Sequence, residues 1–289
     1  MFGWKDLREI IRASSGIVLA RTIFLSRGDR IQLDSDLFIR QLSNPVSPKG
    51  TILMMRGGAF HMGNEGFYIK VSCALLPDYR IYFLEKLKPM VNFEFSEDIS
   101  KILRYLRKIH SEPLIVMGFS MGGILTWTYL GKGQDQADLY VPVSAPINMV
   151  NFNQDIHKHF VYELMYQKVL RDFNVTDDES LFRVSGLTLA DRDLIMKNFL
   201  PSLKRSQPNW QDKTFPVSGT EDTLLESYPE DLKEFPTEVN AVIIPGGTHC
   251  CLTVIWHACL VIRTYTTTRL TGSDLLKAVR EQSVHMISK

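Results

Sequence analysis

The sequence has no excess of charge of either sign. Its 289 residues include 33 lysines and arginines and 32 aspartates and glutamates, which leaves a formal net charge of +1. A protein that binds nucleic acid needs a basic field that attracts phosphates, and this balance gives no sign of one. The sequence therefore predicts no nucleic-acid partner.

Cysteines are few, and long apolar runs are missing. The longest apolar windows, such as residues 250–262, fall well short of the roughly 20 residues that a membrane span needs. Charges throughout the N-terminal MFGWKDLREIIR argue against a secretory signal. We expect a cytoplasmic protein whose first segment could touch a membrane surface. The four cysteines lack the spacing of a metal site and do not predict a disulfide framework: Cys73, Cys250, Cys251 and Cys259.

What the sequence does have is enough apolar material for a large core, since 45% of its residues are hydrophobic. Residues 16–42 predict short strands joined by tight turns at 27–29 and 34–36. Short apolar runs then alternate with helix-like stretches, which predicts an α/β fold with a mostly parallel sheet and helices on both faces. These runs are 51–55, 79–84, 113–117, 139–143, 214–218 and 239–244.

Helical periodicity divides the chain further. Apolar residues recur at helical spacing over 96–110, with Ser96 as the expected N-cap. Between 148 and 210 the strand rhythm stops and helical patterns replace it, which predicts a helical lid over the carboxyl edge of the sheet. We expect residues 1–24 to pack on the core as a separate segment. The core itself would then comprise residues 25–147 and 211–289.

The stretch GFSMGG, residues 118–123, follows an apolar run and precedes a buried helix that Gly131 can end. A G-x-S-x-G pattern between a strand and a helix forces its serine into a sharp turn that exposes Oγ, and small neighbours let the turn pack. This context predicts that Ser120 is a nucleophile.

A serine hydroxyl is a weak nucleophile unless a histidine takes its proton and a carboxylate orients that histidine. In SGTEDTLL, Asp222 lies in the loop that leaves the next-to-last strand, and the adjacent Glu221 remains an alternative. In IPGGTHC, His249 follows the last strand. The sequence therefore predicts a catalytic triad of Ser120, Asp222 and His249.

From about residue 25 to residue 262 the sequence resembles the α/β-hydrolase family, and within it the YheT-like branch of lipid esterases, phospholipases and acyltransferases. The matching stretches are GDRIQLD, EDISKILRYL, GFSMGGILTWTYLGK and VPVSAPINM. The resemblance implies ester hydrolysis or acyl transfer through an acyl-enzyme on Ser120, with neither a cofactor nor a metal. The substrate would be a small acyl ester or a lipid.

The oxyanion of an acyl-transfer intermediate needs two preorganised backbone donors. One should be the N–H of Met121, directly after the nucleophile. The second is expected from the loop RGGAFHMG, residues 56–63, where alignment with the family favours the Gly58 N–H over that of Ala59. Six apolar residues are candidates for the wall of an acyl pocket: Phe60, Phe67, Tyr68, Phe160, Leu164 and Met165.

Three functions fit these residues. A serine carboxylesterase or lipase is the first. An acyltransferase would use the same acyl-enzyme with an alcohol in place of water, and the sequence does not separate the two. A noncatalytic binding protein on the same fold is the third, although such a protein would usually have lost one of the three catalytic groups.

Overall fold

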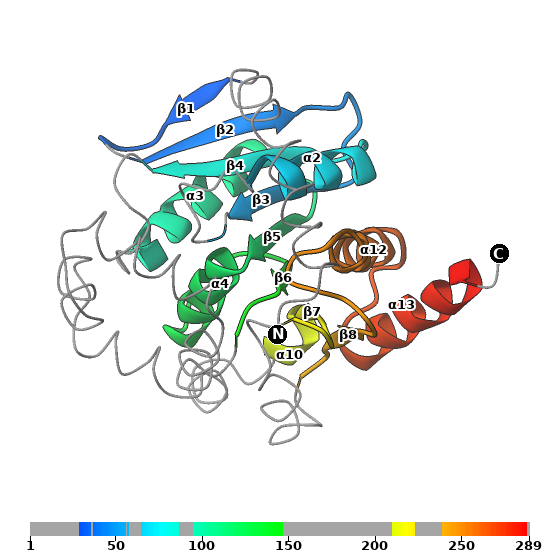
Figure 1. Cartoon of the computed structure of the whole chain (residues 1–289). Helices are drawn as coiled ribbons and strands as arrows, with labels where there is room; N and C mark the ends of the chain where they lie inside the picture. The colour runs from blue at the N-terminus through cyan, green and yellow to red at the C-terminus, as the bar shows by residue number, and fades with distance from the viewer. Residues whose placement is uncertain are drawn as a thin grey trace, which may run out of the picture.

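A computed structural model of the chain describes residues 29–35, 37–55, 57, 65–86, 95–146, 210–222 and 239–287. Its centre is an eight-stranded sheet in the order β1-β2-β4-β3-β5-β6-β7-β8 (Figure 1). The strands are β1 (Arg30–Gln32), β2 (Leu37–Ser43), β3 (Thr51–Met55), β4 (Arg80–Lys86), β5 (Leu114–Phe119), β6 (Leu139–Val143), β7 (Val217–Gly219) and β8 (Val242–Ile244).

The pairing confirms a mostly parallel sheet. The β1–β2 and β2–β4 pairs are antiparallel, and all pairs from β4 through β3 to β8 are parallel. The strand predicted over 214–218 is shorter than expected, because β7 begins only at Val217. The strand predicted over 239–244 is also shorter, since β8 begins at Val242. Pro216 has no N–H to give to a ladder, so Thr214 meets Tyr140 only as an isolated bridge.

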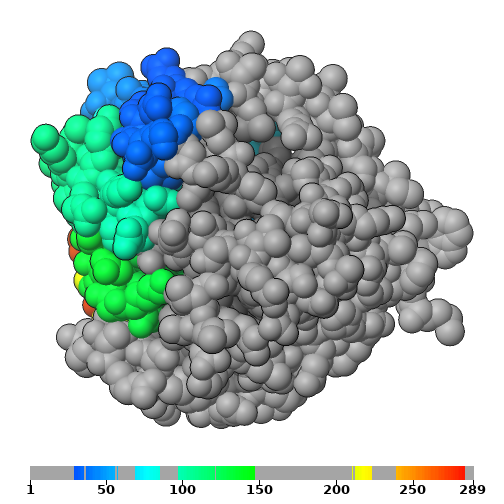
Figure 2. All heavy atoms as spheres, turned by 90° about the vertical axis from the view of Figure 1, so that its left-hand side faces the viewer, coloured from blue at the N-terminus to red at the C-terminus, as the bar shows by residue number. Residues whose placement is uncertain are grey.

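Helices cover both faces of the sheet, as predicted (Figure 1). One face carries α3 (Phe95–Ile109), α4 (Met121–Gly131) and the short α10 (Trp210–Lys213). The other carries α2 (Glu65–Leu75), α12 (Leu252–Thr268) and α13 (Gly272–Ile287). Figure 2 views the first face, where the atoms of β1 and β2 (blue), α3 (teal) and α4 (green) follow one another down one edge.

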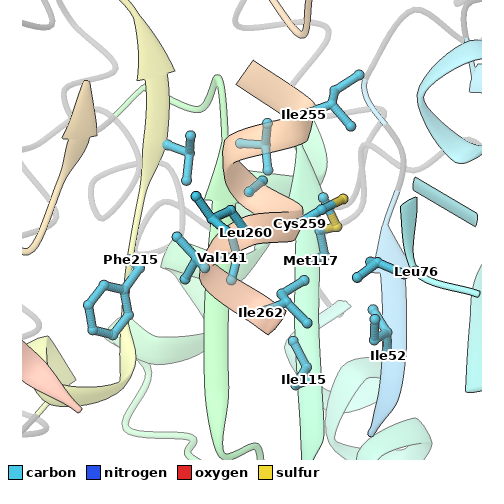
Figure 3. Close-up of a cluster of buried hydrophobic side chains, with 14 of the residues drawn as sticks. Ile52, Leu76, Ile115, Met117, Val141, Phe215, Ile255, Cys259, Leu260 and Ile262 are labelled. Atoms are coloured by element: carbon cyan, nitrogen blue, oxygen red, sulfur yellow. The ribbon is translucent and has the colours of Figure 1, made fainter. Parts of the chain in front are cut away.

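Alternation along the strands divides the core into two layers. In β3, Leu53 and Met55 belong to the cluster under α3 and α4, whereas Ile52 and Met54 belong to the cluster under α12. Such alternation follows from the two-residue period of a strand. Figure 3 shows the second cluster, in which side chains of α12 lie over side chains from the strands. Its labelled members are Ile52, Leu76, Ile115, Met117, Val141, Phe215, Ile255, Cys259, Leu260 and Ile262.

The predicted amphipathic helix forms as α3, with one correction at its start. It begins at Phe95, so Ser96 lies in the first turn and not at the N-cap position. The apolar stripe was expected to include Ile109 as well, but Ile109, the last residue of the helix, is 45% exposed. The other four members are buried against the sheet, as expected: Ile99, Ile102, Leu103 and Leu106. Acidic residues in its first turn and basic residues in its last turn also complement the helix dipole.

Two predicted segments lie outside the described residues. These are the N-terminal segment 1–24 and nearly all of the proposed lid, 148–210, of which only Trp210 is described. Trp210 is buried and meets Trp127 of α4 edge to face, with ring centroids 6.1 Å apart. Across the described part of the chain, no helix combines the length and apolarity needed to cross a membrane.

A polar cluster joins the starts of β3, β4 and β5, at the end of the sheet opposite Ser120. Arg80 pairs with Glu112, which also accepts a hydrogen bond from Thr51 Oγ1 over 2.7 Å. Arg80 Nη1 lies 2.7 Å from His110 Nδ1, and Tyr82 Oη lies 2.9 Å from His110 Nε2. Because a guanidinium can only donate, His110 accepts at Nδ1 and is neutral with its proton on Nε2.

This arrangement predicts a pH-dependent stability. Burial, and then the Arg80 guanidinium, hold the pKa of His110 below its usual value of 6.5. As the pH falls through 6.5, His110 takes up a proton in the unfolded chain more readily than in the folded chain. The free energy of unfolding therefore decreases as the pH falls. We expect His110→Gln to lose less stability than the wild type between about pH 7.5 and about pH 5.5. Urea unfolding at both pH values checks this, and equal losses in the two proteins would contradict it.

Candidate active site

Ser120 lies where β5 ends and α4 begins, in a strained backbone conformation. Its φ is +49° and its ψ is −112°, a region that residues with a side chain rarely adopt. Its N–H donates to the Val143 carbonyl over 2.8 Å, and its own carbonyl accepts from Gly123 N–H over 2.9 Å. The serine is thus held from both sides, and its side chain is partly exposed.

The glycines around Ser120 are required by close backbone approach, as predicted. A Cβ on Gly118 would lie 2.3 Å from the Gly122 carbonyl oxygen. A Cβ on Gly123 would lie 2.3 Å from the Cβ of Ala145, just after β6. Real side chains do not tolerate such distances, so these glycines allow α4 to turn back sharply against β5 and β6.

The turns that follow β7 and β8 are in direct backbone contact. A Cβ on Gly219 would lie 1.9 Å from the Gly247 carbonyl oxygen. That same oxygen accepts a hydrogen bond from Glu221 N–H over 2.9 Å, and Ile244 O accepts one from Thr220 N–H over 3.0 Å. The second turn also uses Gly246 at φ +70°. These contacts hold the segment that carries residue 222 against the segment that carries His249.

Asp222 and His249 meet as a result of this contact. The distances from His249 Nδ1 to Asp222 Oδ2 and Oδ1 are 2.9 and 3.1 Å. Asp222 is almost fully buried, at 2% exposure, while His249 is partly exposed. An ionised carboxylate only accepts hydrogen bonds, so Nδ1 carries the proton and donates it. The lone pair of Nε2 on a neutral imidazole is then left to accept a proton.

The two acidic residues that the sequence left as alternatives differ in this geometry. Asp222 contacts the imidazole, whereas the neighbouring Glu221 is exposed. Within the described part of the chain, the carboxylate found against His249 is therefore that of Asp222.

The candidate oxyanion donors are only partly described. Met121 is the first residue of α4, and the first N–H groups of a helix have no partner within the helix. Its backbone is therefore suited to the donor role. Gly58 and Ala59, the candidates for the second donor, lie outside the described residues.

The residues proposed to line an acyl pocket are also outside what can be described. This applies to Phe60, Phe160, Leu164 and Met165, and to the side chains of Phe67 and Tyr68 in α2. Among the side chains that are described, no group of three His, Cys, Asp or Glu residues gathers as a metal ion would need. All four cysteines are described, and each is a free thiol.

Comparison with solved structures gives the architecture its name. The HSL-homolog EstE7 from a metagenome library superposes with a TM-score of 0.56 at 16% identity, covering 92% of this chain and 99% of its own. TT1662 from Thermus thermophilus gives 0.55 at 10% identity, covering 83% and 98%. A bacterial membrane phospholipase A gives 0.50 at 16% identity, covering 95% and 97%. The chain has the α/β-hydrolase fold.

No family model and no curated protein sequence matches the chain. The likeness is therefore one of fold, at low sequence identity. In an α/β-hydrolase fold, a serine after this strand lies at the carboxyl edge of the sheet, where ligands bind open α/β sheets. Ser120, Asp222 and His249 all follow the carboxyl ends of strands in this chain, namely β5, β7 and β8.

The structure also brings two residues to this edge that sequence reasoning missed. Ser144 directly follows β6, and Cys250 directly follows His249; both have positive φ, +46° and +48°. Cys250 N–H donates to Ser144 Oγ over 2.9 Å. No local pattern predicts a left-handed serine or cysteine. The position of Ser144 along the chain did carry a signal. It is a polar residue directly after the apolar strand β6, and β6 pairs with β5, the strand that precedes Ser120.

The contact between the two turns predicts a severe effect of one methyl group. Gly219→Ala places a Cβ inside the Gly247 carbonyl, so the turns must separate. We expect the free energy of unfolding to fall by about 3 kcal/mol, at the upper end for overpacking. Gly50→Ala is the control, because its Cβ would lie 3.2 Å from Ile115 Cδ1 and 3.3 Å from the Pro113 carbonyl oxygen, contacts that need shifts of only a few tenths of an ångström. Urea unfolding compares the two, and similar losses would contradict the account.

Proposed function

We propose that the protein is a serine hydrolase that cleaves carboxylic esters through an acyl-enzyme on Ser120. The observation that carries this proposal is the contact of the His249 imidazole with the buried Asp222 carboxylate, at the sheet edge where Ser120 occupies a strained turn. A buried aspartate on Nδ1 fixes the tautomer that a general base needs. A structural histidine would not require this combination.

In the proposed first step, Ser120 Oγ attacks the acyl carbonyl carbon while His249 Nε2 takes the hydroxyl proton. Asp222 keeps the proton on Nδ1 and stabilises the imidazolium that forms. The carbonyl oxygen gains the negative charge, and the N–H groups of Met121 and Gly58 are the proposed donors to it. The bond from the carbonyl carbon to the alcohol oxygen then breaks as His249 gives its proton to that oxygen, and the acyl group stays bonded to Ser120 Oγ.

In the second step a water molecule gives a proton to His249 Nε2 while its oxygen attacks the acyl carbonyl carbon. The bond from that carbon to Ser120 Oγ then breaks, His249 returns the proton to Oγ, and the acid is released. The sequence resemblance to the YheT-like branch supports acyl esters or lipids as the substrate class. The membrane phospholipase A of similar fold is consistent with this class. An alcohol in place of water would give acyl transfer, and analysis of the products distinguishes the two reactions.

The proposal predicts covalent labelling by a fluorophosphonate. The purified wild type should react at Ser120, because this probe requires a serine activated by its base. Ser120→Ala and His249→Ala should both lose the label while they stay folded. Hydrolysis of p-nitrophenyl esters of increasing chain length then reports the preferred acyl group. A folded wild type that takes no label and cleaves no ester would favour the noncatalytic binding protein.

The adjacent acidic residues provide a matched pair of variants. Asp222→Asn keeps the size of the side chain, but its amide no longer demands the proton on Nδ1. We expect kcat to fall about a thousandfold or more. Glu221→Gln makes the same chemical change on an exposed neighbour and should stay within about twofold of the wild type. The opposite ranking in ester hydrolysis would assign the role to Glu221.

A further inference from the structure

Ser144 has no assigned part in the proposed reaction, yet it lies beside the nucleophile. It follows β6, whose Val143 pairs with Phe119 of β5 in register. Ser120 follows Phe119 in the same way, so the two serines leave neighbouring parallel strands at the same edge. Ser144 is fully buried, and its N–H donates to the Val217 carbonyl over 2.8 Å.

The conformation of Ser144 indicates that its side chain is needed. Its φ of +46° lies in the left-handed region, which glycine adopts with the least conformational energy. A serine at this position costs conformational energy and also buries a hydroxyl. The hydroxyl has a partner, because Ser144 Oγ accepts the Cys250 N–H over 2.9 Å.

This hydrogen bond acts on His249 through the peptide plane. The Cys250 N–H and the His249 carbonyl belong to one rigid planar unit that begins at the His249 Cα. Fixing the N–H therefore fixes the orientation of the backbone from which the imidazole projects. The side chain of His249 is held separately, by the contact of its Nδ1 with Asp222. His249 is thus held at two points, from β6 and from the turn after β7.

The Cys250 thiol, next to His249 in the sequence, is not a competing nucleophile. Burial, and then the Asp222 carboxylate, raise the pKa of Cys250, while the Ser144 hydroxyl and the Ser120 backbone N–H oppose that shift. The thiol therefore stays protonated at neutral pH and does not compete with Ser120 as a nucleophile.

We infer that Ser144 is a positioning residue for His249, which it holds through the Cys250 N–H so that the imidazole stays aligned between Asp222 and Ser120. The inference rests on the proposed hydrolase function for its kinetic consequence. The structural part, the alignment of His249 with Asp222, can be measured without any reaction.

The test compares Ser144→Ala and Ser144→Gly with the wild type. Both variants lack the Oγ that accepts the Cys250 N–H. Glycine also relieves the left-handed strain, so the glycine variant can be measured if the alanine variant is unstable. We expect the rate of fluorophosphonate labelling and kcat for ester hydrolysis to fall at least about tenfold, with KM little changed. In proton NMR, the downfield signal of the imidazole N–H bound to Asp222 should broaden or disappear in both variants.

Ser218→Ala is the matched control. Ser218 is also a buried serine of the same sheet, in β7, and within the described structure its Oγ has no hydrogen-bond partner. This variant should keep the labelling rate and the downfield signal.

Two results would overturn the inference. One is a labelling rate within about twofold of the wild type in both folded Ser144 variants. The other is a slower labelling rate with an unchanged downfield signal, because a change in the position of His249 could then not explain the slower labelling. A wild type that takes no label but loses its downfield signal on Ser144→Ala would instead overturn the proposed hydrolase function and leave the positioning role in place.

Discussion

The candidate site depends on a contact between two backbone turns. Gly219 and Gly247 pack so closely that neither can carry a side chain without moving the other. Asp222 and His249 follow these glycines by two or three residues, so the contact sets the distance between carboxylate and imidazole. The parallel sheet makes this contact possible, since β7 and β8 pair in register and end at the same edge.

Backbone strain gathers at that edge. Four non-glycine residues of the described chain have positive φ, and Ser120, Ser144 and Cys250 are three of them. They come from the ends of β5 and β6 and from the segment after β8. Cys250 N–H donates to Ser144 Oγ, and Ser120 N–H donates to the carbonyl of Val143, the residue before Ser144. Strained residues persist only where the surroundings determine them, and they concentrate at functional sites. Their grouping at one edge of the sheet, where Asp222 also contacts His249, marks this edge as the candidate site.

The sequence predicted the fold well because its signals are local. Apolar runs located six strands of the sheet, and the glycines of GFSMGG predicted the tight turn that the structure confirms. The errors were local too: Pro216 shortened β7, and α3 began one residue before its expected cap. The choice between Asp222 and Glu221 could not be made from sequence, because it depends on which carboxylate faces inward across a turn. The role of Ser144 depends on a bond between residues 106 positions apart, and no local pattern encodes such a bond.

The acyl group on Ser120 can be trapped by acid quenching of the protein during turnover of a slowly hydrolysed p-nitrophenyl ester, followed by peptide mass spectrometry. We expect an acyl adduct on the peptide that contains GFSMGG, with the modification at Ser120, and none on Ser120→Ala. Turnover without any adduct, or an adduct on Cys250 or Cys251, would contradict this expectation.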